Sequence, residues 1–127
     1  LAKRNAQHNG VDGEFYESDL LDSVPGVYDL IACNPPYIPS TDILMLDPSV
    51  RDYEPVWALD GGEDGLDFYR AVVKNWKSVL RPDGILLFEV GIGQSEAVQE
   101  LMRQAGFLNV SCVVDTGGIE RVVWGRI

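Results

Sequence analysis

The sequence predicts one α/β domain with a largely parallel sheet. Short apolar segments with the composition of strands alternate with segments whose apolar residues recur at helical spacing, and this alternation is typical of a sheet covered by helices. The most apolar segment, Ile85–Val90, is almost continuous, as expected of a central strand that is covered on both faces. With 127 residues, the chain is long enough to bury the core of a single domain.

The first part of the chain is predicted to contain the end of a helix and two strands. Residues 1–10 have the pattern of a helix's last turns, with a glycine as the C-terminal stop. Residues 14–18 form a short strand candidate. The apolar run Tyr28–Cys33 predicts a second, buried strand, and a turn with Pro25 and Gly26 precedes it.

Residues 38–63 are predicted to form a long loop, because prolines interrupt the segment and its apolar residues follow no regular period. A loop of this length in a compact domain is usually functional. Asp47–Arg51 predicts one helical turn within it. Arg51 is expected to pair with a nearby carboxylate, and contact with a substrate is the alternative. The acidic, glycine-rich residues 60–64 are interpreted as a structural loop that braces the turn after Tyr28–Cys33.

A helix and the central strand are predicted to follow. Apolar residues recur at helical spacing from Tyr69 to Leu80, and Asp64 is a candidate cap for this helix. Residues 81–84, with a proline and a glycine, are predicted to end it.

Beyond Ile85–Val90, the pattern predicts one more helix and a pair of strands. Ser95 is predicted to cap the helix, and Gly106 to end it. Leu108–Val114 and Glu120–Gly125 predict two strands joined by a short turn, so the chain is expected to end in an antiparallel pair.

The charge and composition exclude several classes of partner. The formal net charge of −10 argues against non-specific binding to nucleic acid, which needs clustered Lys and Arg, and is compatible with a protein substrate. No apolar stretch has the length of a membrane span, and no signal-peptide pattern opens the chain. Cys33 and Cys112 lie in apolar runs without metal-ligand spacing, so we expect reduced thiols and a cytoplasmic protein.

The chemistry is predicted to centre on Asn34-Pro35-Pro36-Tyr37, which follows the strand Tyr28–Cys33. In open α/β sheets, ligands bind at the carboxyl ends of the strands. The two prolines stiffen the loop and offer carbonyl acceptors without N–H donors. Asn34 adds an amide and Tyr37 adds a flat ring, so the loop suits a planar group that carries an NH2. A proline-rich turn with only a packing role is the alternative interpretation.

Two further polar residues have a weaker claim to function. His8 is the only histidine, and its place beside a helix stop favours a solvated side chain over a catalyst. Glu89 interrupts the central strand near its carboxyl end, where it either has a functional role or bonds to the nearby backbone.

Four segments together resemble a known family. They are Asn34–Pro39, Val50–Pro55, Ala58–Tyr69 and Glu89–Gly91. The sequence is similar to the class I, Rossmann-like methyltransferases that use S-adenosylmethionine. It resembles more narrowly the HemK family, which methylates a glutamine of peptide-chain release factors. The tetrapeptide alone is shared with amino-methyltransferases of DNA and RNA bases, whereas the stretch from Arg51 to Tyr69 is more specific to the release-factor enzymes.

The resemblance implies roles for particular residues. Asn34–Tyr37 would hold the substrate glutamine, with Asn34 and the Pro35 carbonyl as its catalytic acceptors. S-adenosylmethionine would be the cofactor, contacted by Asn34 and by Leu20 beside the adenine, with Asp19 a weaker candidate for the same pocket. Release factors would be the protein partner.

The resemblance also implies that residues 1–127 form the C-terminal part of a catalytic domain. The family's glycine-rich loop and ribose-binding acid follow its first two strands, and both are expected before Leu1. We therefore expect a mostly parallel sheet truncated at the N-terminus, with an antiparallel C-terminal strand and little activity alone. Tyr28–Cys33 would then be a bare edge, and residues 14–18 would have no neighbouring strand. Exposed edges invite pairing with another chain. Self-association through this edge is expected, or displacement or swapping of the first segment.

Two alternatives remain open from the sequence. One keeps the methyltransferase class but places the exocyclic amine of a DNA or RNA base in the site. The other is a non-catalytic polypeptide whose only property is self-association.

Overall fold

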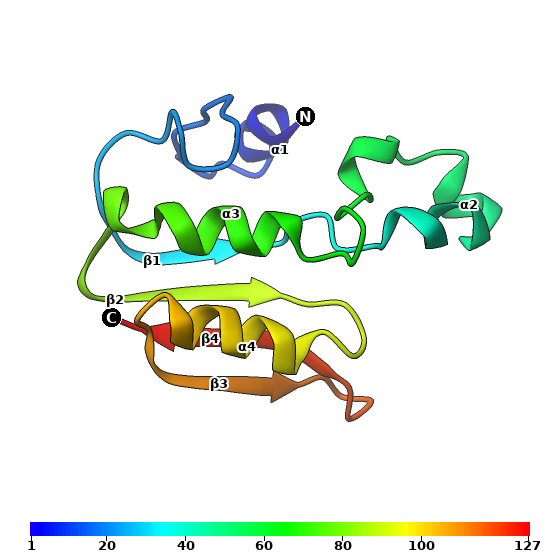
Figure 1. Ribbon diagram of the computed structural model, residues 1–127. Coiled ribbons are helices and arrows are strands. Elements are labelled where there is room, and N and C mark those ends of the chain that lie inside the picture. The colour runs from blue at the N-terminus through cyan, green and yellow to red at the C-terminus, as the bar shows by residue number, and fades with distance from the viewer.

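The computed structural model describes all 127 residues and shows a four-stranded sheet with two helices packed on one face (Figure 1). The strands are β1 (Tyr28–Cys33), β2 (Leu80–Glu89), β3 (Leu108–Val114) and β4 (Glu120–Arg126). The helices are α1 (Ala2–His8), α2 (Pro48–Arg51), α3 (Asp67–Asn75) and α4 (Ser95–Gln104). Short 3-10 turns occupy Ser40–Met45, Val56–Ala58 and Trp76–Ser78. No helix has the length and apolar composition needed to span a membrane.

The sheet has the strand order β1-β2-β4-β3. β1 pairs with β2 in parallel, and β4 lies antiparallel to both β2 and β3. Three strands therefore point one way and the last strand of the chain points the other. This arrangement confirms the predicted α/β fold with an antiparallel C-terminal strand.

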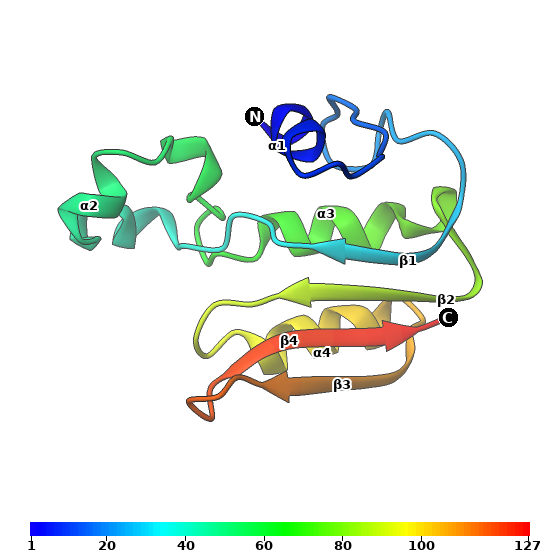
Figure 2. The same ribbon diagram turned by 180° about the vertical axis from the view of Figure 1, so that it is seen from behind.

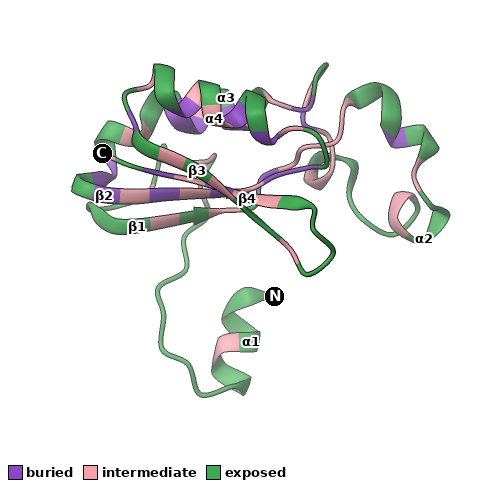
Figure 3. Cartoon of the chain, turned by 90° about the horizontal axis from the view of Figure 1, so that it is seen from below, coloured by how far each residue is buried: buried purple, intermediate pink, exposed green.

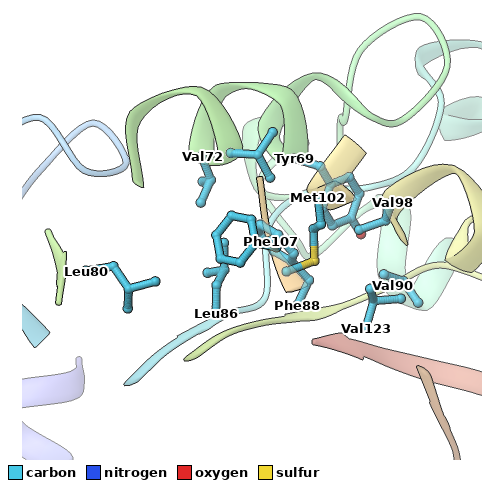
Figure 4. Packing of buried hydrophobic residues seen from close by; sticks show 11 residues of the cluster. Tyr69, Val72, Leu80, Leu86, Phe88, Val90, Val98, Met102, Phe107 and Val123 are labelled. Atoms are coloured by element: carbon cyan, nitrogen blue, oxygen red, sulfur yellow. The ribbon is translucent and has the colours of Figure 1, made fainter. Parts of the chain in front are cut away.

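The core lies between the sheet and the two helices α3 and α4 (Figure 4). Leu86 and Phe88 on β2 and Val90 directly after it alternate along the chain and are fully buried. The ring of Tyr69 from α3 stands edge-on to Phe88, with ring centroids 5.2 Å apart. Met102 from α4 completes the cluster, so the apolar stripes of both helices are core, as their helical spacing predicted.

The predicted cover on both faces of the central strand is wrong for this chain. Figures 2 and 3 show α3 and α4 on the same face, while α1 lies on the opposite side of the sheet and has no buried residue. On that open face Ile85 and Leu87 of β2 are only half-buried. A continuous apolar run therefore does not by itself reveal how many layers cover a strand.

The strand predicted at residues 14–18 is absent. A strand is defined by pairing, and none of these backbone groups bonds to the sheet; only the short turn Asp19–Asp22 closes nearby. The strands predicted at Tyr28–Cys33 and Leu108–Val114 have the predicted bounds, and β4 extends one residue further than expected. Gly10 and Gly106 both have positive φ just after a helix, which confirms them as stops.

Three boundaries differ from the prediction. Leu80 begins β2 instead of ending α3, and residues 81–84 form an irregularity inside β2, where Asp83 has a positive φ. The N-cap of α3 is Leu66, while Asp64 accepts the Leu66 N–H and pairs with Arg70. The N-cap of α4 is Gln94, one residue before Ser95. Boundary signals in sequence are imprecise because several polar residues near a helix start can serve the same N–H groups.

The long loop contains the predicted helical turn. The Asp47 carboxylate accepts the Ser49 N–H at 2.8 Å and so caps α2. Arg51 pairs with Asp52 at 2.8 Å, as expected, and also donates to the Leu44 carbonyl. This loop extends beyond the end of the sheet toward which β1 and β2 point (Figure 1).

Candidate functional site

The tetrapeptide Asn34–Tyr37 leaves the carboxyl end of β1, where the sequence placed it. Pro35 is buried and Asn34 is exposed. The Asn34 side chain makes no hydrogen bond within the chain, and the carbonyls of Asn34, Pro35 and Pro36 accept none. The loop therefore holds a run of unused acceptors on a stiff backbone.

A cavity of about 210 Å³ lies against this loop. Its lining residues are Asn34, Pro35, Pro36, Tyr37, Ile38, Ala58 and Leu59. Ala58 and Leu59 come from the end of the long loop, and neither is among the site residues predicted from the sequence. The Ile38 N–H donates to the Leu59 carbonyl at 3.0 Å, so the two ends of the long loop close beside the tetrapeptide.

The loop at residues 60–64 braces the tetrapeptide, as predicted. The Gly61 N–H donates to the Ile38 carbonyl at 2.8 Å, and Ile38 and Asp60 form a parallel bridge. The Asp60 carboxylate accepts the Ser40 hydroxyl at 2.7 Å and the Gly62 N–H at 3.0 Å. These hydrogen bonds lower the pKa of Asp60, the Ser40 hydroxyl contributing most. Asp60 is thus a structural carboxylate at the base of the site.

Glycines allow three segments to meet at Tyr37. A Cβ at Gly61 would lie 2.8 Å from the Tyr37 Cα, and one at Gly91 would lie 3.0 Å from the Tyr37 ring. Gly65, with a φ of +75°, passes directly against the Tyr37 carbonyl. Side chains at these positions would push the tetrapeptide out of place.

Gln94 joins the same segments by hydrogen bonds. Its Nε2 donates to the Tyr37 carbonyl at 2.8 Å and to the Gly65 carbonyl at 3.3 Å. Its Oε1 accepts the Gly91 N–H at 3.0 Å. Gln94 is not recognisable from the sequence, because its partners are backbone groups of distant segments. The glycines at 61, 65 and 91 are the only signal in the sequence that these segments approach closely.

Glu89 lies at the end of β2 but forms no side-chain hydrogen bond. Its carbonyl accepts the Tyr69 hydroxyl at 2.9 Å, and burial raises the pKa of Tyr69. The backbone of Glu89 therefore has a structural partner, whereas its half-buried carboxylate is unassigned. His8 is exposed at the end of α1, as expected.

Curated relatives match the chain along its whole length. It is 47% identical over 128 aligned residues to a Geobacter sulfurreducens protein named release factor glutamine methyltransferase. Proteins of the same name from Bacillus anthracis and Cereibacter sphaeroides are 42% and 43% identical, again over all of this chain. The chain belongs to the HemK family of release factor glutamine methyltransferases. It spans about 45% of the length of the Geobacter relative and 46% of the other two.

A family model and one solved structure agree with this HemK-family assignment, and a second structure supports the fold. The model described as "Methyltransferase small domain" matches residues 1–45. A release-factor-specific protein-(glutamine-N5) methyltransferase from Alicyclobacillus acidocaldarius is 31% identical with a TM-score of 0.50, over 79% of this chain and 48% of that one. A methyltransferase from Pyrococcus furiosus has a TM-score of 0.64 at 16% identity, over 98% of this chain and 55% of that one, which supports the fold alone.

Two of the three residues assigned to the cofactor from the HemK-family resemblance, Leu20 and Asp19, lie apart from the tetrapeptide cavity, whereas Asn34 lines it. Leu20, with a φ of 50°, lines a separate hollow of about 180 Å³ with Asp67, Phe68 and Ala71 of α3. Asp19 is exposed in the preceding turn and lines neither hollow. The structure thus groups Asn34 to Tyr37 in one cavity and places Leu20 at the first turns of α3.

Larger hollows occur elsewhere on this HemK-family chain. One of about 460 Å³ lies between α3 and α4 and includes no tetrapeptide residue. Another, of about 390 Å³, lies beside the site, and Tyr37, Ile38 and Gln94 contribute to its lining. Cavity size therefore does not identify the site, and the unused acceptors of the tetrapeptide distinguish its cavity from the others.

Proposed function

We propose that this chain supplies the substrate-binding loop of an S-adenosylmethionine-dependent enzyme that methylates a glutamine side-chain amide in peptide-chain release factors. The proposal is supported by the unused carbonyls of Asn34, Pro35 and Pro36 beside an aromatic ring. The names of the relatives point to the same substrate. Such an enzyme works in the cytoplasm, where translation ends.

The chemistry explains why acceptors are the groups required. An amide nitrogen is a poor nucleophile because its lone pair is delocalised into the carbonyl. The Asn34 side-chain oxygen and the Pro35 carbonyl accept the two N–H bonds of the substrate amide and fix its plane. They also stabilise the positive charge that grows on nitrogen during transfer. Such alignment contributes up to roughly 7–11 kcal/mol in well-oriented reactions, and the product loses its proton afterwards without a strong base.

S-adenosylmethionine supplies a methyl group on a positively charged sulfur, and the residues present fit part of this cofactor. The hollow formed by Leu20, Phe68 and Ala71 offers an apolar surface suited to a flat adenine ring. Asn34 stands at the carboxyl end of β1, where its amide is free to contact the cofactor as well as the substrate. Asp19 adds a carboxylate next to Leu20 in the chain.

The alternative of methylating a DNA or RNA base is not favoured. A formal charge of −10 opposes binding to a phosphate backbone. The curated relatives that match the whole chain carry the release-factor name. The alternative of a non-catalytic polypeptide that only self-associates is not favoured either, because the curated relatives that match the whole chain are named as methyltransferases.

The proposal is tested with Asn34→Ala in a chimaera where this chain replaces the matching segment of the Geobacter sulfurreducens relative. We expect turnover on that organism's release factor to fall by about 100-fold, because one acceptor for the substrate amide is lost. The affinity for S-adenosylmethionine, measured by calorimetry, should change much less.

Asn75→Ala is the matched control, because Asn75 is exposed at the far end of α3. It should leave turnover unchanged. Equal turnover in Asn34→Ala and the parent would contradict the assignment of Asn34, and methylation of DNA by the parent in place of the release factor would contradict the substrate.

A further inference from the structure

We infer that Gln94 is a positioning residue whose side-chain amide holds the tetrapeptide in its substrate-binding geometry. This inference rests on the proposed function and adds a residue that acts through Tyr37, without contact to substrate. Its basis is a bridge of three hydrogen bonds made by the Gln94 side chain. These bonds are separate observations from the free carbonyls that support the proposed reaction.

The bridge connects three separate segments. Gln94 stands directly before α4, and its amide reaches the loop after β1, the glycine-rich loop before α3 and the turn after β2. The two carbonyl partners require the NH2 end of the amide, and the Gly91 N–H requires its oxygen. Only one orientation of the amide satisfies all three partners.

The bridge divides the carbonyls of the tetrapeptide into two groups. Gln94 occupies the Tyr37 carbonyl, whereas the three preceding carbonyls accept no hydrogen bond from the chain. Fixing the last carbonyl therefore leaves the others free for a substrate amide. Positional errors well below 1 Å matter for such a reaction, so a loop anchor of this kind bears directly on turnover.

Close packing prevents other groups from replacing the bridge. A Cβ at Gly91 would lie 2.7 Å from the Gln94 Oε1, and one at Gly65 would lie 2.6 Å from its Nε2. The Gln94 side chain thus fills the gap between the segments.

Gln94→Glu isolates the role of the NH2 group, because it keeps the shape and the acceptor for the Gly91 N–H. Ionised, the new carboxylate faces the Tyr37 and Gly65 carbonyls with no donor and repels them. Protonated, it regains one O–H donor.

The charged or titratable groups of the adjoining hollow are Tyr37, Asp42, Asp64 and Arg121. Arg121 already pairs with Asp115 at 3.3 Å and Asp64 with Arg70, so Asp42 is the lining charge without an ion-pair partner, and it favours the protonated form.

The activity test uses the same chimaera with Gln94→Glu and Gln94→Met. We expect kcat on the release factor to fall at least tenfold in both, with the KM for S-adenosylmethionine nearly unchanged. Relative to the parent at each pH, Gln94→Glu should regain kcat as the pH falls, whereas Gln94→Met should not. Gln99→Glu is the control, since Gln99 lies on α4 and bonds only to the nearby residues Ser95 and Arg103.

Amide hydrogen exchange of the 127-residue chain provides a second measurement, independent of the reaction. The Ile38 N–H, bonded to Leu59, should exchange faster in both Gln94 variants, whereas Gly91 should lose protection only in Gln94→Met. Unchanged kcat in an active chimaera, or unchanged exchange at Ile38, would overturn the inference. If the parent chimaera does not methylate the release factor, that result refutes the proposed function instead. The exchange rate at Ile38 is then the measurement that tests the role of Gln94.

Discussion

Single residues at the end of β1 differ in chemistry because their surroundings differ. Asn34 is exposed and keeps its amide free, while Cys33, one residue earlier, packs against the core. Alternation along a strand places neighbouring side chains on opposite faces, so one residue is available for chemistry and the next is shielded from water.

Burial raises the pKa of the Cys33 thiol to about 11, because the interior disfavours the thiolate. At pH 8 the folded protein therefore holds the Cys33 thiol protonated. As the pH rises from the pKa of the unfolded thiol toward 11, ionisation of this thiol favours the unfolded chain, so the folded protein loses stability. We expect iodoacetamide to label Cys33 about a hundredfold more slowly at pH 8 than in urea. Mass spectrometry of the Cys112→Ser variant isolates this thiol.

The labelling rate should climb steadily as the pH approaches the raised pKa. Equal rates in the folded and unfolded protein at pH 8 would show that the thiol is not shielded as the structure indicates.

Loops and turns hold the site through backbone contacts that depend on glycine. Gly65 and Gly93 both have positive φ, at +75° and +81°, so an alanine is strained at either position. They differ in space: a Cβ at Gly65 meets the Tyr37 carbonyl and Gln94, whereas nothing lies within 4 Å of one at Gly93.

This pair separates backbone strain from loop contact. Gly93→Ala should cost about 1–2 kcal/mol of unfolding free energy from the strained φ alone. Gly65→Ala should cost a further ~1–3 kcal/mol, because the new methyl group displaces the tetrapeptide. Urea unfolding followed by circular dichroism gives both values. Equal midpoints for the two variants would contradict the close approach at Tyr37.

The whole molecule exposes apolar surface at its sheet. β1 is paired only with β2, its residues Tyr28 and Leu30 are 37% and 53% exposed, and no helix packs on the face opposite α3 and α4. An open strand edge next to an apolar face favours pairing with a second copy of the chain.

We expect the mass of the isolated chain, measured by light scattering, to increase with concentration. Leu30→Lys should weaken this association, because a charge on the edge disfavours pairing. Leu44→Lys is a suitable control, since Leu44 is 79% exposed on the long loop, away from the edge. A monomer at every concentration would exclude association through β1.

Local patterns were sufficient for much of the fold and for the position of the tetrapeptide at the end of β1. The apolar run of β1, the glycine after α4 and the turn between β3 and β4 each act within a few residues, so their elements follow from neighbouring side chains. The tetrapeptide belongs to this group, because its stiffness and its acceptors are properties of Asn34 and two prolines in succession.

Long-range pairing decided the remainder. Residues 14–18 have the composition of a strand but no partner, Leu80 joins β2 instead of the helix before it, and helices cover one face of the sheet only. The sequence alone determined that a stiff run of carbonyl acceptors follows β1. Only the tertiary structure decided that Gln94 holds them, because its partners at Tyr37, Gly65 and Gly91 are backbone groups that folding brings together.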